Sequence, residues 1–219
     1  MNNKELTFSE KEDIYYKIKN FKFHTEFYAR ENRLDEVASW AIWEPSDLND
    51  TKIIEKPDSI KKLKPNYVFV LLNFAGNGDV DFEDPAWKSW QNFHTNYPMD
   101  KRLFNVLKDP KYEGAYMTDI IKCVKTSGTD ELQKMIKNGE IDMNTQRDIF
   151  INEINILNNG NLEIYLMGDY TERIFNKYIY KKIQDKIQKP KKILHPSPDG
   201  IRNNTVFYER IRSQLGING

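Results

Sequence analysis

The strongest constraint on the fold is the apolar stretch YVFVLLNF at residues 67–74. Six consecutive apolar residues follow Pro65 and Asn66, and the sequence AGNGD then ends the run. A short apolar run without polar alternation is typical of a strand that is covered by helices on both faces, as in parallel sheets. We therefore expect the core to be built around this strand.

Other segments predict strands and helices that alternate along the chain. Further strands are expected at 114–123, 162–168 and 191–196, and a strand with buried tryptophans is expected at 38–44. Helices are expected at 8–30, 85–94, 100–108, 144–158, 169–178 and 203–215, with another beginning near Thr129. This alternation predicts the α/β class, as a three-layer α/β/α arrangement around a central, mostly parallel four-stranded sheet.

The length and composition limit the organisation and the class of protein. All 219 residues are expected to form a single domain, with residues 1–60 as a helical and strand extension packed on it. Lys and Arg number 33 and Asp and Glu also number 33, so the net charge is zero. No apolar run approaches the roughly 20 residues of a membrane helix, and the N-terminal segment is not of signal-peptide type. We expect a cytoplasmic monomer that does not bind membranes.

The cysteine and histidine content argues against a metal or cofactor. Cys123 is the only cysteine, which excludes an intrachain disulfide and a cluster held by four cysteines. The three histidines, His24, His94 and His195, are far apart and show no zinc spacing. AGNGD matches neither the dinucleotide fingerprint nor the Walker motif, so no glycine-rich phosphate loop supports an unrelated α/β enzyme that acts on a small nucleotide or sugar phosphate.

Polar motifs end the predicted parallel strands, where ligands bind in sheets of this kind. LLNFAGN (71–77) resembles the first motif of the mismatch-specific and single-strand-selective branches of the uracil-DNA glycosylase superfamily. GAYMTDIIK (114–122) resembles the middle strand of the mismatch-specific branch, and LEIYLMGDYTERIF (162–175) resembles the strand and helix that precede the second motif. HPSP (195–198) is similar to the second motif of the main branch. In order and spacing, the resemblance covers about residues 65–215.

The resemblance implies a uracil-DNA glycosylase-like fold and a DNA glycosylase that acts in base excision repair. Such an enzyme hydrolyses the N-glycosidic bond of a damaged or deaminated base, without metal or cofactor. By resemblance, Asn73 would hold the water, His195 would stabilise the departing base, Phe74 would stack on the base, and Asp119 would occupy the base-reading position. Alternative stacking residues are Phe82, Trp87, Trp90 and Phe93. An amide orients a water but is no general base at neutral pH, so catalysis is expected to be slow.

DNA is the partner that the resemblance implies. The backbone amides around Ser197 and Gly200 would bind a phosphate, and Ile201 would enter the gap left by a flipped nucleotide. The segment 177–192 carries seven lysines and one aspartate, a charge of 7 − 1 = +6. These lysines form either a basic surface beside the site or an ordinary solvated helix face.

Three departures from the family motifs leave alternatives open. Phe74 stands where the first motif has proline, and the second motif continues as Asp-Gly where the main branch has Leu-Ser. Asp119 stands where the family has asparagine, and an ionised carboxylate can only accept hydrogen bonds.

Three interpretations of Asp119 remain. It selects a base that presents an amino donor; or it lies outside the pocket, or the protein does not excise uracil at all; or it is a strand-end carboxylate bonded to loop amides. The alternative function is a non-catalytic member of the same fold that binds nucleic acid, a nucleotide or a protein.

Overall fold

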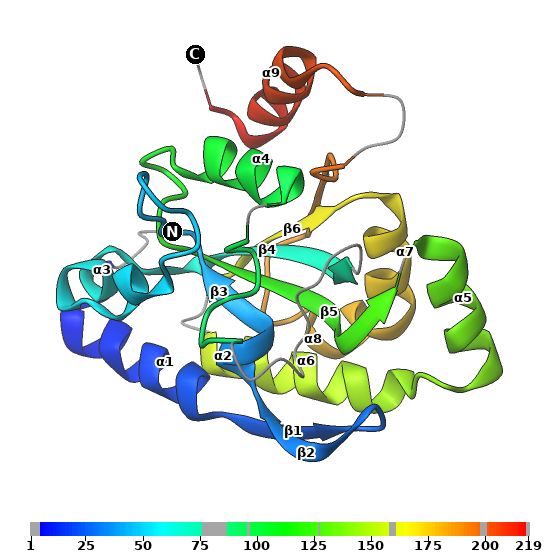
Figure 1. Cartoon of the computed structure of the whole chain (residues 1–219). Helices are drawn as coiled ribbons and strands as arrows, with labels where there is room; N and C mark the ends of the chain where they lie inside the picture. Colours follow the sequence, from blue (N-terminus) through cyan, green and yellow to red (C-terminus); the bar gives the residue numbers. More distant parts are fainter. Residues whose placement is uncertain are drawn as a thin grey trace.

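A five-stranded sheet forms the centre of the protein in a computed structural model that describes residues 5–75, 87–95, 97–126, 128–157, 161–197 and 201–217 (Figure 1). The strands, in their order across the sheet, are β3 (Ala38–Trp40), β5 (Ala115–Thr126), β4 (Lys64–Ala75), β6 (Glu163–Met167) and β7 (Lys191–Ile193). Neighbouring strands are parallel except for β3, which pairs antiparallel with β5. The protein is thus mixed α/β with a mostly parallel sheet.

The central sheet has five strands, so the prediction of a four-stranded sheet is wrong. The four parallel strands are present in the predicted segments, and β3 is the fifth. Residues 38–44 were expected to form a strand, but three residues pair too briefly for the sequence to show which sheet they join. Their register on β5, with Ala38 opposite Thr118, is set by tertiary contacts.

β4 is covered on both faces, as its apolar run predicts. Val68, Val70 and Leu72 belong to one hydrophobic core, and Phe69 and Leu71 belong to a second core. Because successive side chains of a strand point to opposite faces, one apolar strand contributes to both layers. This explains why the run shows no polar alternation.

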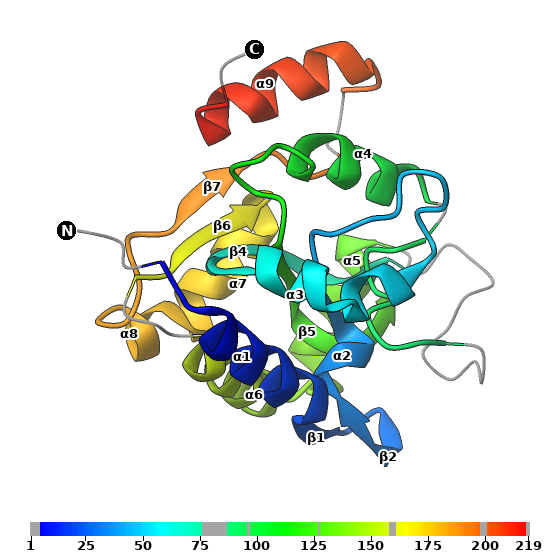
Figure 2. The ribbon, with the colours of Figure 1, turned by 90° about the vertical axis from the view of Figure 1, so that its left-hand side faces the viewer.

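Helices pack on both faces of the sheet (Figure 2). One face is covered by α1 (Phe8–Asn20), α6 (Met143–Leu157) and α7 (Asp169–Tyr178), and the other by α4 (Pro98–Leu107) and α9 (Asn204–Leu215). The remaining helices are α2 (Leu34–Val37), η1 (Thr51–Glu55), α3 (Pro57–Lys62), α5 (Thr129–Asn138) and α8 (Tyr180–Ile183). No helix in the described ranges is both long enough and apolar enough to cross a membrane.

The N-terminal segment differs from its prediction. α1 begins with a Thr7–Glu10 capping box and ends at Asn20, and the chain then forms a hairpin of β1 (Lys22–Thr25) and β2 (Tyr28–Arg33). The predicted helix over 8–30 is therefore wrong after residue 20. Exposed and buried residues alternate over only four positions of β1, too few to outweigh the helical pattern before them.

The predicted helix at 85–94 is also wrong within its described part. Residues 87–95 form turns, and Trp90 and Phe93 adopt φ angles of 65° and 68°. Trp90 is fully buried among side chains of the N-terminal segment. Burial of these aromatic residues fixes an irregular backbone that local preference would not select.

Candidate functional site

A cavity of about 610 Å³ lies beside β4 and β5, between these strands, helix α4 with the residues before it, and the segment that follows β7. Six residues singled out in the sequence line it: Asn73, Phe74, Phe93, Asp119, His195 and Ser197. The other lining residues are Leu71, Asn92, Thr95, Tyr97, Pro98, Met99, Asp100, Arg102, Gly128 and Pro196. Two strands, β4 and β5, the segment after β7, and α4 with the residues before it therefore meet around one space.

Asn73 is held at the end of β4 by its side-chain amide. Nδ2 donates to Thr126 Oγ1 at 2.9 Å, to the Val124 carbonyl at 3.2 Å and to the Phe74 carbonyl at 3.1 Å. The β4–β5 register shifts between Asn73 and Phe74, and this irregularity brings both residues to the cavity. With its donor group committed to the protein, Asn73 has its carbonyl Oδ1 as the remaining polar atom, and Oδ1 can only accept.

His195 lies two residues beyond β7, in a short turn that fixes its ring. The Ser197 backbone N–H donates to His195 Nδ1 at 3.1 Å, and the Ser197 carbonyl lies 3.3 Å from the same nitrogen. The shorter contact comes from a group that can only donate, so it requires an acceptor at Nδ1; a neutral ring that accepts there carries its proton on Nε2. The imidazole therefore presents an N–H at Nε2.

Gly168 permits the position of His195. Gly168 follows β6 with φ of 99°, a conformation that favours glycine, and its N–H donates to the Ile193 carbonyl at 2.9 Å. A Cβ at this position would lie 3.2 Å from His195 Cβ. The end of β6 can approach the histidine turn because residue 168 has no side chain.

Arg102 of α4 holds the turn after His195 and was not anticipated. Its Nη1 donates to the Pro196 carbonyl at 2.8 Å, Nε donates to Asn204 Oδ1 at 3.0 Å, and Nη2 donates to the Arg202 carbonyl at 3.4 Å. The guanidinium also lies 5.0 Å from the centre of the Phe207 ring. No sequence signal connects an arginine on one helix with partners about a hundred residues later.

Asp119 lies inside the cavity wall, within β5 and not at its end. Its side chain is 3% exposed. Oδ2 accepts from Asn92 Nδ2 at 3.0 Å, and Oδ1 has no hydrogen-bond partner in the described part of the chain. Burial raises the pKa of this carboxyl to about 7, against the opposing effect of the Asn92 hydrogen bond. The interpretation that Asp119 lies outside the pocket is wrong, and its partner is a side-chain amide where loop amides were expected.

Asp100 is a second buried carboxyl in the same wall, and sequence reasoning missed it. It lies in the first turn of α4, where Oδ2 accepts from the Thr95 N–H at 2.9 Å and from the Thr95 hydroxyl. Burial raises the pKa of Asp100 to about 6. Together, Asp100 and Asp119 make this wall rich in hydrogen-bond acceptors.

The aromatic candidates separate into cavity residues and packing residues. Phe74 and Phe93 line the cavity. Trp87 packs edge-on against Phe74 at 5.5 Å, and its Nε1 donates to the Glu36 carbonyl at 2.9 Å. Trp90 belongs to the core, and Phe82 lies outside the described residues.

His94, the other histidine near this region, has a structural role. It is fully buried and stacks on Trp43 with 5.0 Å between ring centres. Its Nε2 lies 3.1 Å from the Trp40 carbonyl, and burial lowers the pKa of the imidazole to about 4.

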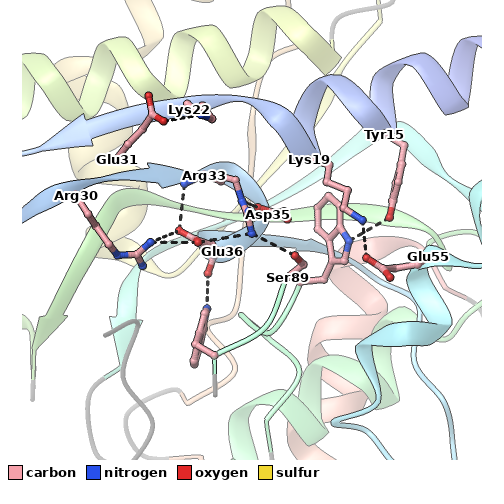
Figure 3. A network of polar contacts seen from close by, with 12 residues as sticks. Tyr15, Lys19, Lys22, Arg30, Glu31, Arg33, Asp35, Glu36, Glu55 and Ser89 are labelled. Carbon is pink, nitrogen blue, oxygen red and sulfur yellow. Dashed lines mark hydrogen bonds and ion pairs between the residues drawn. The ribbon is translucent and has the colours of Figure 1, made fainter. Parts of the chain in front are cut away.

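A polar network from the N-terminal segment positions the cavity wall formed by residues 87–95 (Figure 3). Arg33 Nε donates to the fully buried Asp35 at 3.0 Å, and Arg33 Nη2 donates to Ser89 Oγ at 3.5 Å. The Asp35 carbonyl accepts from the Trp90 N–H, and Trp90 Nε1 donates to the Tyr15 hydroxyl at 3.3 Å. The N-terminal segment thus contributes to the site through the turns that it holds.

A larger open groove of about 1070 Å³ adjoins the cavity and shares His195 and Ser197 with it. Ile201 lines this groove, whereas Gly200 lies outside the described residues. The basic residues that line it are Arg173, Lys192, Arg202 and Arg210. Of the seven lysines in 177–192 only Lys192 lies in the groove, so most of the predicted basic segment is elsewhere.

Comparison of the sequence with protein-family models and with curated proteins finds no match. Among the described residues, no group of three or more His, Cys, Asp or Glu side chains is arranged to hold a metal ion.

Proposed function

We propose that this protein is a DNA glycosylase that hydrolyses the N-glycosidic bond of a damaged or deaminated base. One observation carries the proposal. Asn73, Phe74, Asp119, His195 and Ser197 belong to motifs far apart in the sequence, and they line a single cavity. Those motifs are the ones by which the chain resembles the uracil-DNA glycosylase superfamily.

Asn73 suits the role of orienting the attacking water. Its Nδ2 contacts with Thr126 and Val124 direct the amide, so Oδ1 is available to accept a hydrogen bond from water. Hydrolysis passes through an oxocarbenium-like sugar, which a weakly activated water can attack once it is positioned under the sugar carbon. A slow enzyme is the expected result, because an amide takes no proton from the water.

His195 suits the stabilisation of the departing base. Since the Ser197 N–H donates to Nδ1, a neutral ring carries its N–H at Nε2, and His195 would donate to the base through this atom. A fixed donor aimed at a base carbonyl stabilises negative charge as the glycosidic bond breaks. Arg102 keeps the ring in place through its hydrogen bond to the Pro196 carbonyl, and acts as a positioning residue.

The basic groove suits the DNA backbone on either side of a flipped nucleotide. Phosphate contacts from arginine and lysine supply most of the affinity that does not depend on sequence. Ser197 lines both the groove and the cavity, and Ile201 lines the groove beside it. These positions fit a phosphate contact and an apolar wedge at the mouth of the cavity.

A second candidate function is binding of the same nucleotide without hydrolysis. The wall formed by Asp100 and Asp119 favours it, because at a pH above their raised pKa values of about 6 and about 7 the ionised carboxylates oppose negative charge on a leaving base. The two functions differ in base release but share the cavity and the groove.

The test is base release from labelled single- and double-stranded oligonucleotides that contain uracil, hypoxanthine, xanthine or a mismatch. Asn73→Ala and His195→Ala should abolish release, whereas the matched controls Asn155→Ala and His24→Ala, at exposed positions, should retain it. Binding without release would replace the proposal with the second candidate. A folded protein that neither binds nor cleaves any of these oligonucleotides would overturn both.

A further inference from the structure

We propose that the cavity selects a base of the cytosine type, with an exocyclic amino group that donates to Asp119 and a ring carbonyl that accepts from His195. The inference rests on the proposed glycosylase function and specifies its substrate class. It is carried by the unpartnered carboxyl oxygen in the cavity wall.

When Asp119 is ionised, at a pH above its pKa of about 7, its Oδ1 can only accept and requires a donor from outside the described chain. The side chain is 3% exposed, and Oδ1 has no partner there while Oδ2 is bonded to Asn92. A buried polar atom without a hydrogen bond is costly, so a ligand that donates to it is strongly favoured over one that does not. The cavity in front of Asp119 is where such a ligand would lie.

Asn92 cannot supply a hydrogen-bond donor to a base carbonyl in this part of the cavity. Its Nδ2 carries two hydrogens, and they are used by the Val37 carbonyl at 2.7 Å and by Asp119 Oδ2 at 3.0 Å. Neither hydrogen remains for a carbonyl of the base. Asp100, in the same wall, adds only a carboxyl whose Oδ2 already accepts from Thr95.

The donors and acceptors on the edge of each base then decide whether the cavity prefers cytosine or uracil. Uracil presents a carbonyl oxygen on each side of its N3–H, so one carbonyl would face the ionised Asp119 carboxylate acceptor to acceptor. Cytosine and its 5-substituted derivatives present an amino group on one side of N3 and a carbonyl on the other. The amino group meets the need of Asp119 Oδ1, and the carbonyl meets the Nε2–H of His195.

The experiment compares two single-stranded oligonucleotides that differ only in cytosine or uracil at one position, at pH 8, where Asp119 is ionised. Wild-type protein should release cytosine at least about tenfold faster than uracil, since a site built for a hydrogen bond rejects the analogue that lacks it. Asp119→Asn keeps the shape but supplies an N–H, so the preference should reverse. Asp185→Asn, at an exposed position, is the matched control and should leave the preference unchanged.

The outcomes separate the substrate class from the function. Release of both bases without preference, or an equal loss for both in Asp119→Asn, would overturn the inference and leave the glycosylase in place. If no base is released at all, the same pair is measured as binding with 2′-fluoro nucleotides. Tighter binding of the cytosine strand that reverses in Asp119→Asn would still support the inference, and equal binding would overturn it. Should Asp119→Asn fail to fold, a wild-type preference for uracil suffices to overturn it.

Discussion

Replacement of Asp119 by asparagine should stabilise the protein at alkaline pH. The carboxyl is 3% exposed, and burial raises its pKa from 3.8 to about 7. Between these two values the unfolded chain ionises the group while the folded protein keeps it protonated. The folded state then binds more protons than the unfolded state, so the free energy of unfolding falls as pH rises through this window.

The magnitude follows from the pKa difference. Each pKa unit corresponds to about 1.36 kcal/mol, so 7 − 3.8 = 3.2 units cost the wild-type protein about 4 kcal/mol at pH 8. At pH 5 the cost is about 2 kcal/mol, because only the lower part of the window has been crossed. Asparagine carries no titratable proton and can still accept from Asn92, so Asp119→Asn should gain about 2.7 kcal/mol more at pH 8 than at pH 5.

Urea unfolding of both proteins at pH 5 and pH 8 measures this difference. With an m-value of about 2 kcal/mol per M, the gap between the two midpoints should widen by about 1 M from pH 5 to pH 8. Asp185→Asn, at an exposed site, should show no such widening. If the gap for Asp119→Asn stays constant between the two pH values, the carboxyl does not change protonation on unfolding and the reasoning fails.

Three further predictions concern the structure around the site. Gly168→Ala should lower the free energy of unfolding by about 1–3 kcal/mol and displace His195, because φ is 99° and the new Cβ would lie 3.2 Å from His195 Cβ; urea unfolding and base release measure the two effects. Lys122→Met should lower the free energy of unfolding by about 3–5 kcal/mol, because it removes the 2.8 Å ion pair of the fully buried Glu153. The double variant Lys122→Met with Glu153→Leu should recover most of this loss in urea unfolding, and a double variant that recovers none of it would show that the pair is stabilising. His94→Gln should reduce the loss of stability at acid pH. Burial lowers the pKa of His94 from 6.5 to about 4, so the free energy of unfolding of the wild-type protein falls by about 3 kcal/mol as the pH drops from above 6.5 to 4. A His94→Gln variant that shows the same fall in urea unfolding would contradict this.

Local patterns predicted the parts of the fold that depend on local chemistry. The apolar run of β4, the helix signals of α4 and α6 and the strand ends of β6 and β7 are close to their predicted positions. The pattern failed where tertiary contacts override local preference. The hairpin after Asn20 and the turns at 87–95 are fixed by burial of Phe23 and Trp90 in cores assembled from distant segments.

The same division applies to the site. The sequence by itself predicted that Asn73 and His195 lie at the carboxyl ends of apolar strands, in motifs that meet at one edge of a parallel sheet. Only the tertiary structure decided what surrounds them: the Asn92 amide that occupies one oxygen of Asp119, the second carboxyl of Asp100, and Arg102 on the turn of His195. Strand and helix patterns reflect the hydropathy of neighbouring residues, so they can be read along the chain. A hydrogen bond between side chains far apart in sequence depends on how the layers pack, and no local pattern specifies that packing.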